Sequence, residues 1–361
     1  MTKHIGILTS GGDCAGLNAV IRAVVHRAIE GYGWRVTGIH RGTDGLLHRP
    51  VRSEDLTLRV FTGNILRLGG TILGTTNRGD PFALTAGSDE SDRADRSAQA
   101  IAGYRSLGLD ALIAVGGDGS LRILRRLAQQ GGIDLVAIPK TIDNDLGLTE
   151  SSVGYNTAML VATEALDRLH PTAESHDRVM ILEVMGRDAG HIALAAGVAG
   201  GADVILIPEI PYTIENVVQK IVEIRNQGRN FALVVVAEGV PGPEGRPLTM
   251  PQADGRTTYG GIGHALAAPI ADLSGAETRV TVLGHVQRGG TPTPRDRLMA
   301  SAFGVHAVDL VARGCFDRMV AWRNRDVTDV PLADAIAEYH AVDVEGALAR
   351  TARGLGICLG N

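Results

Sequence analysis

Short apolar runs alternate along the chain with longer stretches of helical periodicity. Residues 4–9 predict a buried strand, and residues 10–16 predict a turn. From Leu17 to Ile29 the apolar side chains recur at i, i+3, i+4 and i+7, which predicts one buried face of a helix. Further strands are predicted at residues 35–39, 111–115, 135–138, 179–183, 204–207, 231–237 and 280–283.

This alternation predicts the fold class. Strands that are followed by helices form βαβ units on a parallel sheet, as where a helical pattern at residues 214–224 follows a strand. The strands are too many for one ordinary sheet, and 361 residues suit two domains of ordinary size. We therefore expect an α/β protein with two domains.

Composition and charge narrow the possible partners. The chain has 35 Lys and Arg against 40 Asp and Glu, a net charge of −5, and no long basic run, so nucleic acid is not an expected partner. Uncharged apolar stretches such as residues 192–200 fall far short of the ~18 residues that cross a bilayer, so no membrane is expected either. The N-terminus lacks the apolar core of a signal peptide. Three cysteines without CxxC spacing predict neither a disulfide framework nor a zinc site, and the cytoplasm is the expected location.

Two predicted strand-to-helix turns are rich in glycine, and their sequences are TSGGDCAGLN and VGGDGSLR. Ligands bind at such turns on a parallel sheet. Absent side chains let backbone N–H groups approach a phosphate, and the following helix adds its positive N-terminus. Neither turn has a complete Walker A or GxGxxG pattern, so each alone is also compatible with a simple tight connection.

A third segment, PKTIDNDLGL, places two carboxylates close together after a predicted strand. Asp143 and Asp145 are two residues apart, and like charges this close need a metal ion, a cation or a substrate hydroxyl to share. The alternative is an Asx-rich surface turn in which Asp143 or Asn144 acts as a cap.

Basic residues follow or flank two more strands. Arg187 lies in EVMGRDAGH, and Arg279, His285 and Arg288 lie in ETRVTVLGHVQRGGTP. Any one of them could be a solvated charge at a strand end. Together with two glycine-rich turns and an aspartate pair, they indicate a phosphoryl-transfer site.

These segments occur in the order found in the 6-phosphofructokinase family, and the chain resembles that family from residue 5 to about residue 297. The resemblance implies an α/β fold of two Rossmann-like parallel-sheet domains with an active-site cleft between them. The nucleotide-binding lobe would comprise residues 1–154 plus about 287–335, and the sugar-phosphate lobe residues 155–286 plus about 336–361. The implied reaction is phosphorylation of the C1 hydroxyl of fructose 6-phosphate by Mg-ATP, as in glycolysis.

The resemblance also implies roles for the phosphoryl-transfer residues. Asp143 would be the general base that takes the proton of the C1 hydroxyl. Asp118 would hold Mg²⁺, with Asp145 helping to place the metal or the attacking group. Gly11, Thr141 and Arg187 would stabilise the moving phosphoryl group. The implied ATP-binding residues are Gly11, Gly12, Asn77, Arg78, Gly117, Asp118, Gly119, Ser120 and Lys140.

For the sugar phosphate, the resemblance implies two groups of residues. Within one subunit they are Thr141, Asp143, Met185, Gly186, Arg187, Glu238, His285 and Arg288, of which His285 and Arg288 would hold the 6-phosphate. Arg178 and Arg279 match positions that reach this phosphate from a neighbouring subunit, since the Arg fork suits phosphate. The expected assembly is therefore a homotetramer or homodimer with shared active sites.

Two residues give conflicting indications of which phosphoryl donor the enzyme uses. Gly119 is typical of family members that use ATP, whereas Lys140 is typical of those that use pyrophosphate. ATP is the expected donor, and a pyrophosphate-dependent phosphotransferase is the alternative. A hypothesis from another class is a catalytically silent, nucleotide-binding regulatory paralogue, although Asp118, Thr141, Asp143 and Arg187 are all present.

Overall fold

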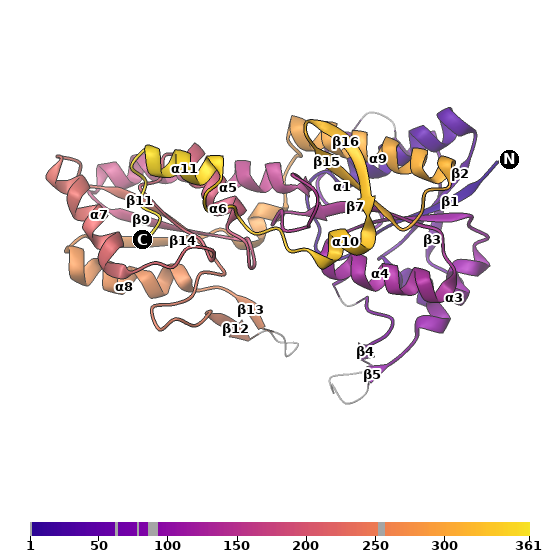
Figure 1. Ribbon diagram of the computed structural model, residues 1–361, viewed down its shortest axis with the longest axis horizontal. Coiled ribbons are helices and arrows are strands. Elements are labelled where there is room, and N and C mark those ends of the chain that lie inside the picture. Colours follow the sequence, from indigo (N-terminus) through magenta and orange to yellow (C-terminus); the bar gives the residue numbers. More distant parts are fainter. Residues whose placement is uncertain (1, 62–63, 78, 86–92, 252–256) are drawn as a thin grey trace. The chain divides into compact units, whose positions relative to one another are not determined.

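The computed structural model describes residues 2–61, 64–77, 79–85, 93–251 and 257–361. The chain forms two compact units. Unit 1 comprises Met1–Thr157 and Arg288–Tyr339, and unit 2 comprises Ala158–Gln287 and His340–Asn361. Both are built from helices and predominantly parallel sheets, so the α/β expectation is confirmed (Figure 1).

Unit 1 contains a mixed sheet in the order β16-β15-β7-β6-β1-β2-β3, with β8 beside β7. Neighbours from β15 to β2 run parallel, whereas β16 and β3 are antiparallel edge strands. The bounds are β1 His4–Thr9, β2 Arg35–Ile39, β3 Ser53–Leu56, β6 Ala111–Gly116, β7 Leu135–Thr141, β8 Val153–Gly154, β15 Arg318–Arg323 and β16 Asp326–Pro331.

Helices cover both faces of this sheet (Figure 1). α1 (Leu17–His26) packs against α9 (Pro294–Arg313) on one face, and α3 (Ser97–Ser106) packs against α4 (Asp118–Gly131) on the other. The predicted helix at residues 17–29 is thus α1 followed by a π-helical turn, Arg27–Gly31. Smaller elements are α2 Thr43–Leu47, α10 Leu332–Ala337, and the paired strands β4 Leu84–Thr85 and β5 Arg93–Ala94.

Unit 2 contains an all-parallel sheet in the order β10-β11-β9-β14. Its strands are β9 Val179–Val184, β10 Val204–Leu206, β11 Ala232–Ala237 and β14 Thr278–Val282. A separate pair of antiparallel strands is formed by β12 (Thr249–Pro251) and β13 (Thr257–Tyr259). The helices are α5 Tyr155–Ser175, which begins in unit 1, α6 His191–Ala199, α7 Ile214–Asn226, α8 Ile262–Ser274 and α11 Ala347–Gly354.

The predicted strands are confirmed, with ends shifted by up to three residues. Most are continuous apolar runs buried on both faces of a covered parallel sheet, whereas β14, at the edge of its sheet, is only partly buried. The hairpin of β15 and β16 was not predicted. Its two-residue loop holds Asn324 and Arg325 at φ of 52° and 65°, as a type I′ turn requires. The loop sequence is Asn-Arg instead of the usual Asn-Gly, so the sequence lacks the pattern that would have indicated this hairpin.

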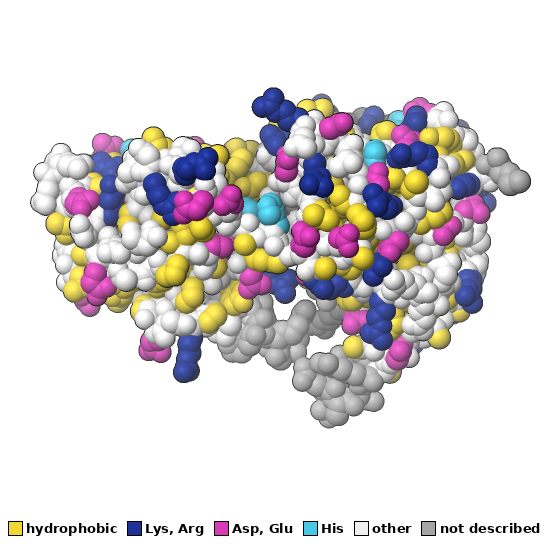
Figure 2. Space-filling view, in the orientation of Figure 1, with side chains coloured by type: hydrophobic (Ala, Val, Ile, Leu, Met, Phe, Trp, Pro, Cys, Tyr) yellow, Lys and Arg dark blue, Asp and Glu magenta, His cyan; other side chains and the backbone are white. Residues whose placement is uncertain are grey.

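Surface charge and hydropathy add little to this picture. On the face shown in Figure 2, Lys and Arg side chains are scattered among Asp and Glu side chains over both units. Within the described residues, no helix is both long enough and apolar enough to cross a membrane.

Candidate functional site

The strand order of unit 1 predicts where a ligand binds. β2 lies on one side of β1 and β6 lies on the other, so the connections to these two neighbours leave β1 in opposite directions along the sheet. In open α/β sheets such a switch point marks the ligand crevice at the carboxyl ends of the strands. Both glycine-rich turns follow these strands, one after Thr9 of β1 and one after Gly116 of β6.

Close packing around Gly11 joins these turns to the end of β7. Gly11 has φ of +84°, and a Cβ at this position would lie 2.7 Å from Ser120 Oγ and 3.5 Å from Lys140 Nζ. Its N–H donates to the Thr76 carbonyl at 3.1 Å, and its carbonyl accepts from the Thr75 hydroxyl at 2.6 Å. The fold therefore brings Gly11, Ser120 and Lys140 together from three separate sequence segments.

The second turn opens directly into α4. Asp118 is the first residue of this helix, and its carboxylate accepts a hydrogen bond from Arg122 Nε at 2.7 Å. A Cβ at Gly119 would meet nothing within 4 Å, so this position faces open space. Backbone N–H groups at the start of a 14-residue helix, next to an open position, suit a phosphate.

Strand β7 is longer than the apolar run predicted and includes both Lys140 and Thr141. Lys140 is 4% exposed, and burial lowers the pKa of its ammonium group, with the Arg288 charge acting in the same direction. A Cβ at Gly117 would lie 3.9 Å from Lys140 Nζ and 3.9 Å from Thr141 Cβ. Lys140 therefore places a buried amine close to both glycine-rich turns.

The loop after β7 is buried, so the interpretation of PKTIDND as a surface turn is wrong. Asp143, Asn144 and Asp145 are each less than a tenth exposed. The Asp143 N–H donates to the Thr141 hydroxyl at 3.1 Å. Burying two carboxylates is unfavourable without compensation, which supports a functional reason for their position.

Asn144 fixes the shape of this loop. Sequence patterns indicate only that this residue could act as a cap. It adopts φ of +56°, in the left-handed region that Asn tolerates. Its Oδ1 accepts from the Ser152 N–H at 2.9 Å, and its Nδ2 donates to the Glu150 carbonyl at 3.2 Å. The Ser152 hydroxyl donates to the Thr141 carbonyl at 2.7 Å. These bonds hold the two aspartates in place.

The donor set of unit 1 fits Mg²⁺ in kind. Mg²⁺ prefers hard oxygen ligands and is commonly held by one or two carboxylates plus substrate phosphates. Asp118 is about one third exposed, and Asp145 is buried in the loop after β7. Asp118 could supply one carboxylate without a dedicated protein cage, and the described residues contain no cluster of three or more metal-ligating side chains.

Three other expected site residues, Arg288, Asn77 and Arg78, lie outside the buried loop that follows β7. The Arg288 guanidinium lies within unit 1, where Nη1 donates to the Asp13 carbonyl at 3.2 Å and sits 2.7 Å from where a Gly12 Cβ would be. Asn77 is exposed. Arg78 lies outside the described residues.

In unit 2, Met185, Gly186 and Arg187 form a turn directly after β9, and Glu238 follows β11 beside it. Glu238 Oε1 accepts from the Arg187 N–H at 3.1 Å, and the Glu238 N–H donates to the Val184 carbonyl at 2.8 Å. The Arg187 side chain is 62% exposed, with its Nε 3.5 Å from Asp188. This edge therefore presents Arg187 together with the carboxylates of Asp188 and Glu238. His285 is exposed in the 3₁₀ turn Gly284–Arg288.

Arg178 and Arg279 are at the opposite end of the same sheet. Arg178 precedes β9 and Arg279 is near the start of β14, and these strands run parallel. Glu277 forms an ion pair with each arginine. Its Oε2 lies 3.1 Å from Arg178 Nε, and its Oε1 pairs with Arg279 Nη2. The hydrogen bond from Arg178 is the main reason that the pKa of Glu277 is lowered. About seven residues of extended strand, roughly 20 Å, separate Arg178 from Met185.

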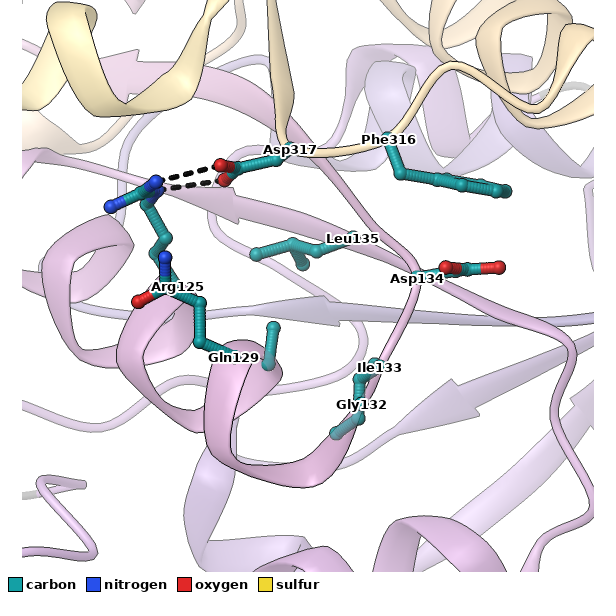
Figure 3. A pocket seen from close by; sticks show the side chains of 9 residues that line it. Arg125, Gln129, Gly132, Ile133, Asp134, Leu135, Phe316 and Asp317 are labelled. Atoms are coloured by element: carbon teal, nitrogen blue, oxygen red, sulfur yellow. Dashed lines mark hydrogen bonds and ion pairs between the residues drawn. The ribbon is translucent and has the colours of Figure 1, made fainter.

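A cavity of about 330 Å³ lies elsewhere in unit 1, between the end of α4 and the start of β7 (Figure 3). Arg125 lines it, but its Nε and Nη2 each donate to the Asp317 carboxylate at 2.7 Å. The cavity is at the amino end of β7, away from the glycine-rich turns. The glycine-rich turns are the better candidate ligand site, because their backbone N–H groups and helix N-terminus suit a phosphate.

Comparison with known proteins gives matches along almost the whole chain. A sequence model described as phosphofructokinase matches residues 4–311. A Synechocystis sp. protein named ATP-dependent 6-phosphofructokinase 1 is 62% identical over 359 residues, 99% of each chain. A Nostoc sp. protein of the same name is 60% identical over 359 residues, again 99% of each chain.

The structure has a similar fold to a solved fungal enzyme. It matches Pichia pastoris phosphofructokinase in the T-state with a TM-score of 0.81 and 30% identity. The match covers 93% of this chain and 36% of that one, so the chain spans just over a third of the fungal chain's length.

Proposed function

The chain belongs to the phosphofructokinase family, and we propose that it transfers the γ-phosphoryl group of Mg-ATP to the C1 hydroxyl of fructose 6-phosphate, giving fructose 1,6-bisphosphate in glycolysis. The observation that carries the proposal is the buried loop after β7. This loop holds Asp143 beside Thr141, at the same edge of the sheet at which the two glycine-rich turns leave β1 and β6. A cytoplasmic location belongs to the same proposal.

In the proposed mechanism, Asp143 accepts the proton of the C1 hydroxyl as the hydroxyl oxygen attacks the γ-phosphorus. The bond between the γ-phosphorus and the β,γ-bridging oxygen breaks, and ADP leaves. Thr141 and Arg187 stabilise the charge on the moving phosphoryl group, with Gly11 in the turn that lines the phosphates. Asp118 would hold Mg²⁺, which supplies charge neutralisation at the phosphates when bound, and Asp145 would help to place the metal or the attacking group.

The donor phosphates bind to unit 1. The residues are Gly11, Gly12, Asn77, Gly117, Asp118, Gly119, Ser120 and Lys140, with Arg78 outside the described part of the chain. The open space at Gly119 leaves room for the α-phosphate of a nucleotide. The curated relatives that are named as ATP-dependent favour the same donor.

The sugar phosphate binds to Met185, Gly186, Arg187, Glu238 and His285 of unit 2 and to Thr141, Asp143 and Arg288 of unit 1. Arg178 and Arg279 serve the 6-phosphate of a second copy of the chain, because they lie at the opposite end of their sheet from the Met185 turn, roughly 20 Å away along β9 for Arg178. A homodimer or homotetramer with shared active sites follows.

A donor assay tests the proposal. Purified protein is given fructose 6-phosphate and Mg²⁺ with either ATP or pyrophosphate as the sole donor, and fructose 1,6-bisphosphate is measured. We expect turnover with ATP. Turnover with pyrophosphate alone would reassign the donor and give Lys140 the role it has in pyrophosphate users. No turnover with either donor would favour the regulatory paralogue.

A further inference from the structure

One buried amide is used by none of the roles above. Gln287 lies in the 3₁₀ turn Gly284–Arg288 and is 1% exposed. Its Oε1 accepts a hydrogen bond from the Met185 N–H at 2.7 Å, across 102 residues of sequence. The bond is within unit 2, and it reaches the first residue of the turn that carries Arg187.

The orientation of the Gln287 amide is fixed by this bond. A backbone N–H is only a donor, so the atom that faces it must be the carbonyl oxygen. Nε2 then points away, and it is buried with no hydrogen-bond partner in the described part of the chain. A buried amide donor without a partner is unfavourable, and an apolar side chain of similar size would avoid it. Gln287 is therefore explained by its oxygen rather than by its nitrogen.

The turn that Gln287 reaches needs support. Arg187 has φ of +52°, a left-handed conformation that is uncommon for a residue with a Cβ. A Cβ at Gly186 would lie 2.4 Å from the Ala189 carbonyl oxygen, so the turn is also tight. Such a conformation persists only where the surroundings hold it.

Two side chains hold the turn from both ends. The Gln287 side chain accepts a hydrogen bond from the Met185 N–H, and the Glu238 side chain accepts one from the Arg187 N–H at 3.1 Å. We infer that Gln287 is a positioning residue: by fixing the Met185 backbone, it sets the direction from which the Arg187 guanidinium meets the phosphoryl group. The inference rests on the proposed function, since it takes Arg187 to act on the reacting group.

A double-mutant cycle tests this coupling. Gln287→Met removes the acceptor but keeps the bulk, and we expect kcat to fall by ~10–100-fold, with KM for ATP unchanged because the nucleotide contacts are on unit 1. Arg187→Ala should cost ~10²-fold or more. If Gln287 acts through Arg187, the double variant should be within ~3-fold of Arg187→Ala alone. Losses that multiply would overturn the inference.

A matched control uses the same substitution elsewhere in unit 2. Gln219 is exposed on α7, where its Nε2 donates to Glu223 at 3.0 Å, and Gln219→Met should leave kcat within ~2-fold of wild type. Should Gln287→Met fail to fold, the cycle is run with Gln287→Asn, whose shorter side chain withdraws the oxygen from Met185.

Amide hydrogen exchange gives a readout that does not depend on activity. The Met185 and Arg187 amides should exchange at least ~10-fold faster in the Gln287 variant, while β9 amides stay protected. Unchanged exchange at Met185 would overturn the inference even if the enzyme is active. A wild-type protein that does not phosphorylate fructose 6-phosphate would instead refute the proposed function and leave the exchange result to decide the role of Gln287.

Discussion

Asp296 accepts two hydrogen bonds from Thr157, one from its N–H at 2.8 Å and one from its hydroxyl. It also accepts from the Gly154 N–H at 3.0 Å. Asp296 is in the first turn of α9 and is fully buried, while Thr157 is in the first turn of α5. One carboxylate therefore caps α5 and ties it to α9.

Asp296→Asn should destabilise unit 1. The amide keeps one acceptor oxygen and replaces the other with a donor, so the N–H of either Gly154 or Thr157 loses its acceptor, at about 1–3 kcal/mol for a buried donor left without a partner. Urea unfolding measures the change. Asp272→Asn, at an exposed position of α8, is the control and should stay within about 0.5 kcal/mol of wild type. Equal midpoints for the two variants would contradict the capping role.

Asp329 provides a pH-dependent contribution. Burial opposes its ionisation, but hydrogen bonds from Arg318 and His306 outweigh burial and lower its pKa. Because the folded pKa lies below the unfolded one, the stabilisation is present above the unfolded value and is lost as pH falls through the folded value. The stability difference between wild type and Asp329→Asn should therefore be largest near neutral pH and shrink below about pH 4. Unfolding titrations across this range would show a constant difference if the ion pair were irrelevant.

Asp143→Asn should abolish most of kcat with little change in KM. The carboxylate acts on the hydroxyl proton in the transition state, and loss of a general base costs ~10²-fold or more. Steady-state assays with ATP and fructose 6-phosphate measure both constants. Asp134→Asn is the matched control, at an exposed position at the amino end of β7. A variant that kept more than about a tenth of wild-type kcat would not have lost the base.

Gly119→Asp should destroy ATP-dependent turnover without unfolding the protein. A Cβ at this position meets nothing within 4 Å, so the side chain fits the fold, but its carboxylate would repel the α-phosphate of a nucleotide. Gly119→Ala tests bulk without charge and should keep more activity. Thermal melting should leave both variants close to wild type. Retained ATP turnover in Gly119→Asp would show that the α-phosphate binds elsewhere.

Mixed oligomers test the shared site. Asp143→Asn subunits lack the base but keep Arg279, whereas Arg279→Ala subunits keep the base but cannot serve a neighbour. Each pure variant should be nearly inactive at low fructose 6-phosphate, since a charge-assisted contact to the 6-phosphate or the base is missing. Refolding the two together should restore part of the activity. If mass measurement confirms mixed oligomers without any gain, Arg279 acts within its own chain.

The sequence by itself determined the parts of this protein that depend on local patterns. Apolar runs located the central strands of both sheets, because a strand covered on both faces is apolar, but not the edge strands β3 and β16 or strands β8 and β15. The two glycine-rich turns could be found because glycine lets a backbone approach a phosphate, and the resemblance to the family singled out Gly11 and Gly119 within them. Asp143 stood out because a carboxylate pair after a strand is unfavourable without a function.

Tertiary structure decided the relationships that join distant segments. It buried the loop after β7 through Asn144 and Ser152, and it placed Gln287 against Met185. It also put Arg178 and Arg279 on one carboxylate at the far end of the sheet from Arg187. No local pattern encodes these contacts, because strand order and direction set them, and a one-residue change in register would turn each side chain to the other face.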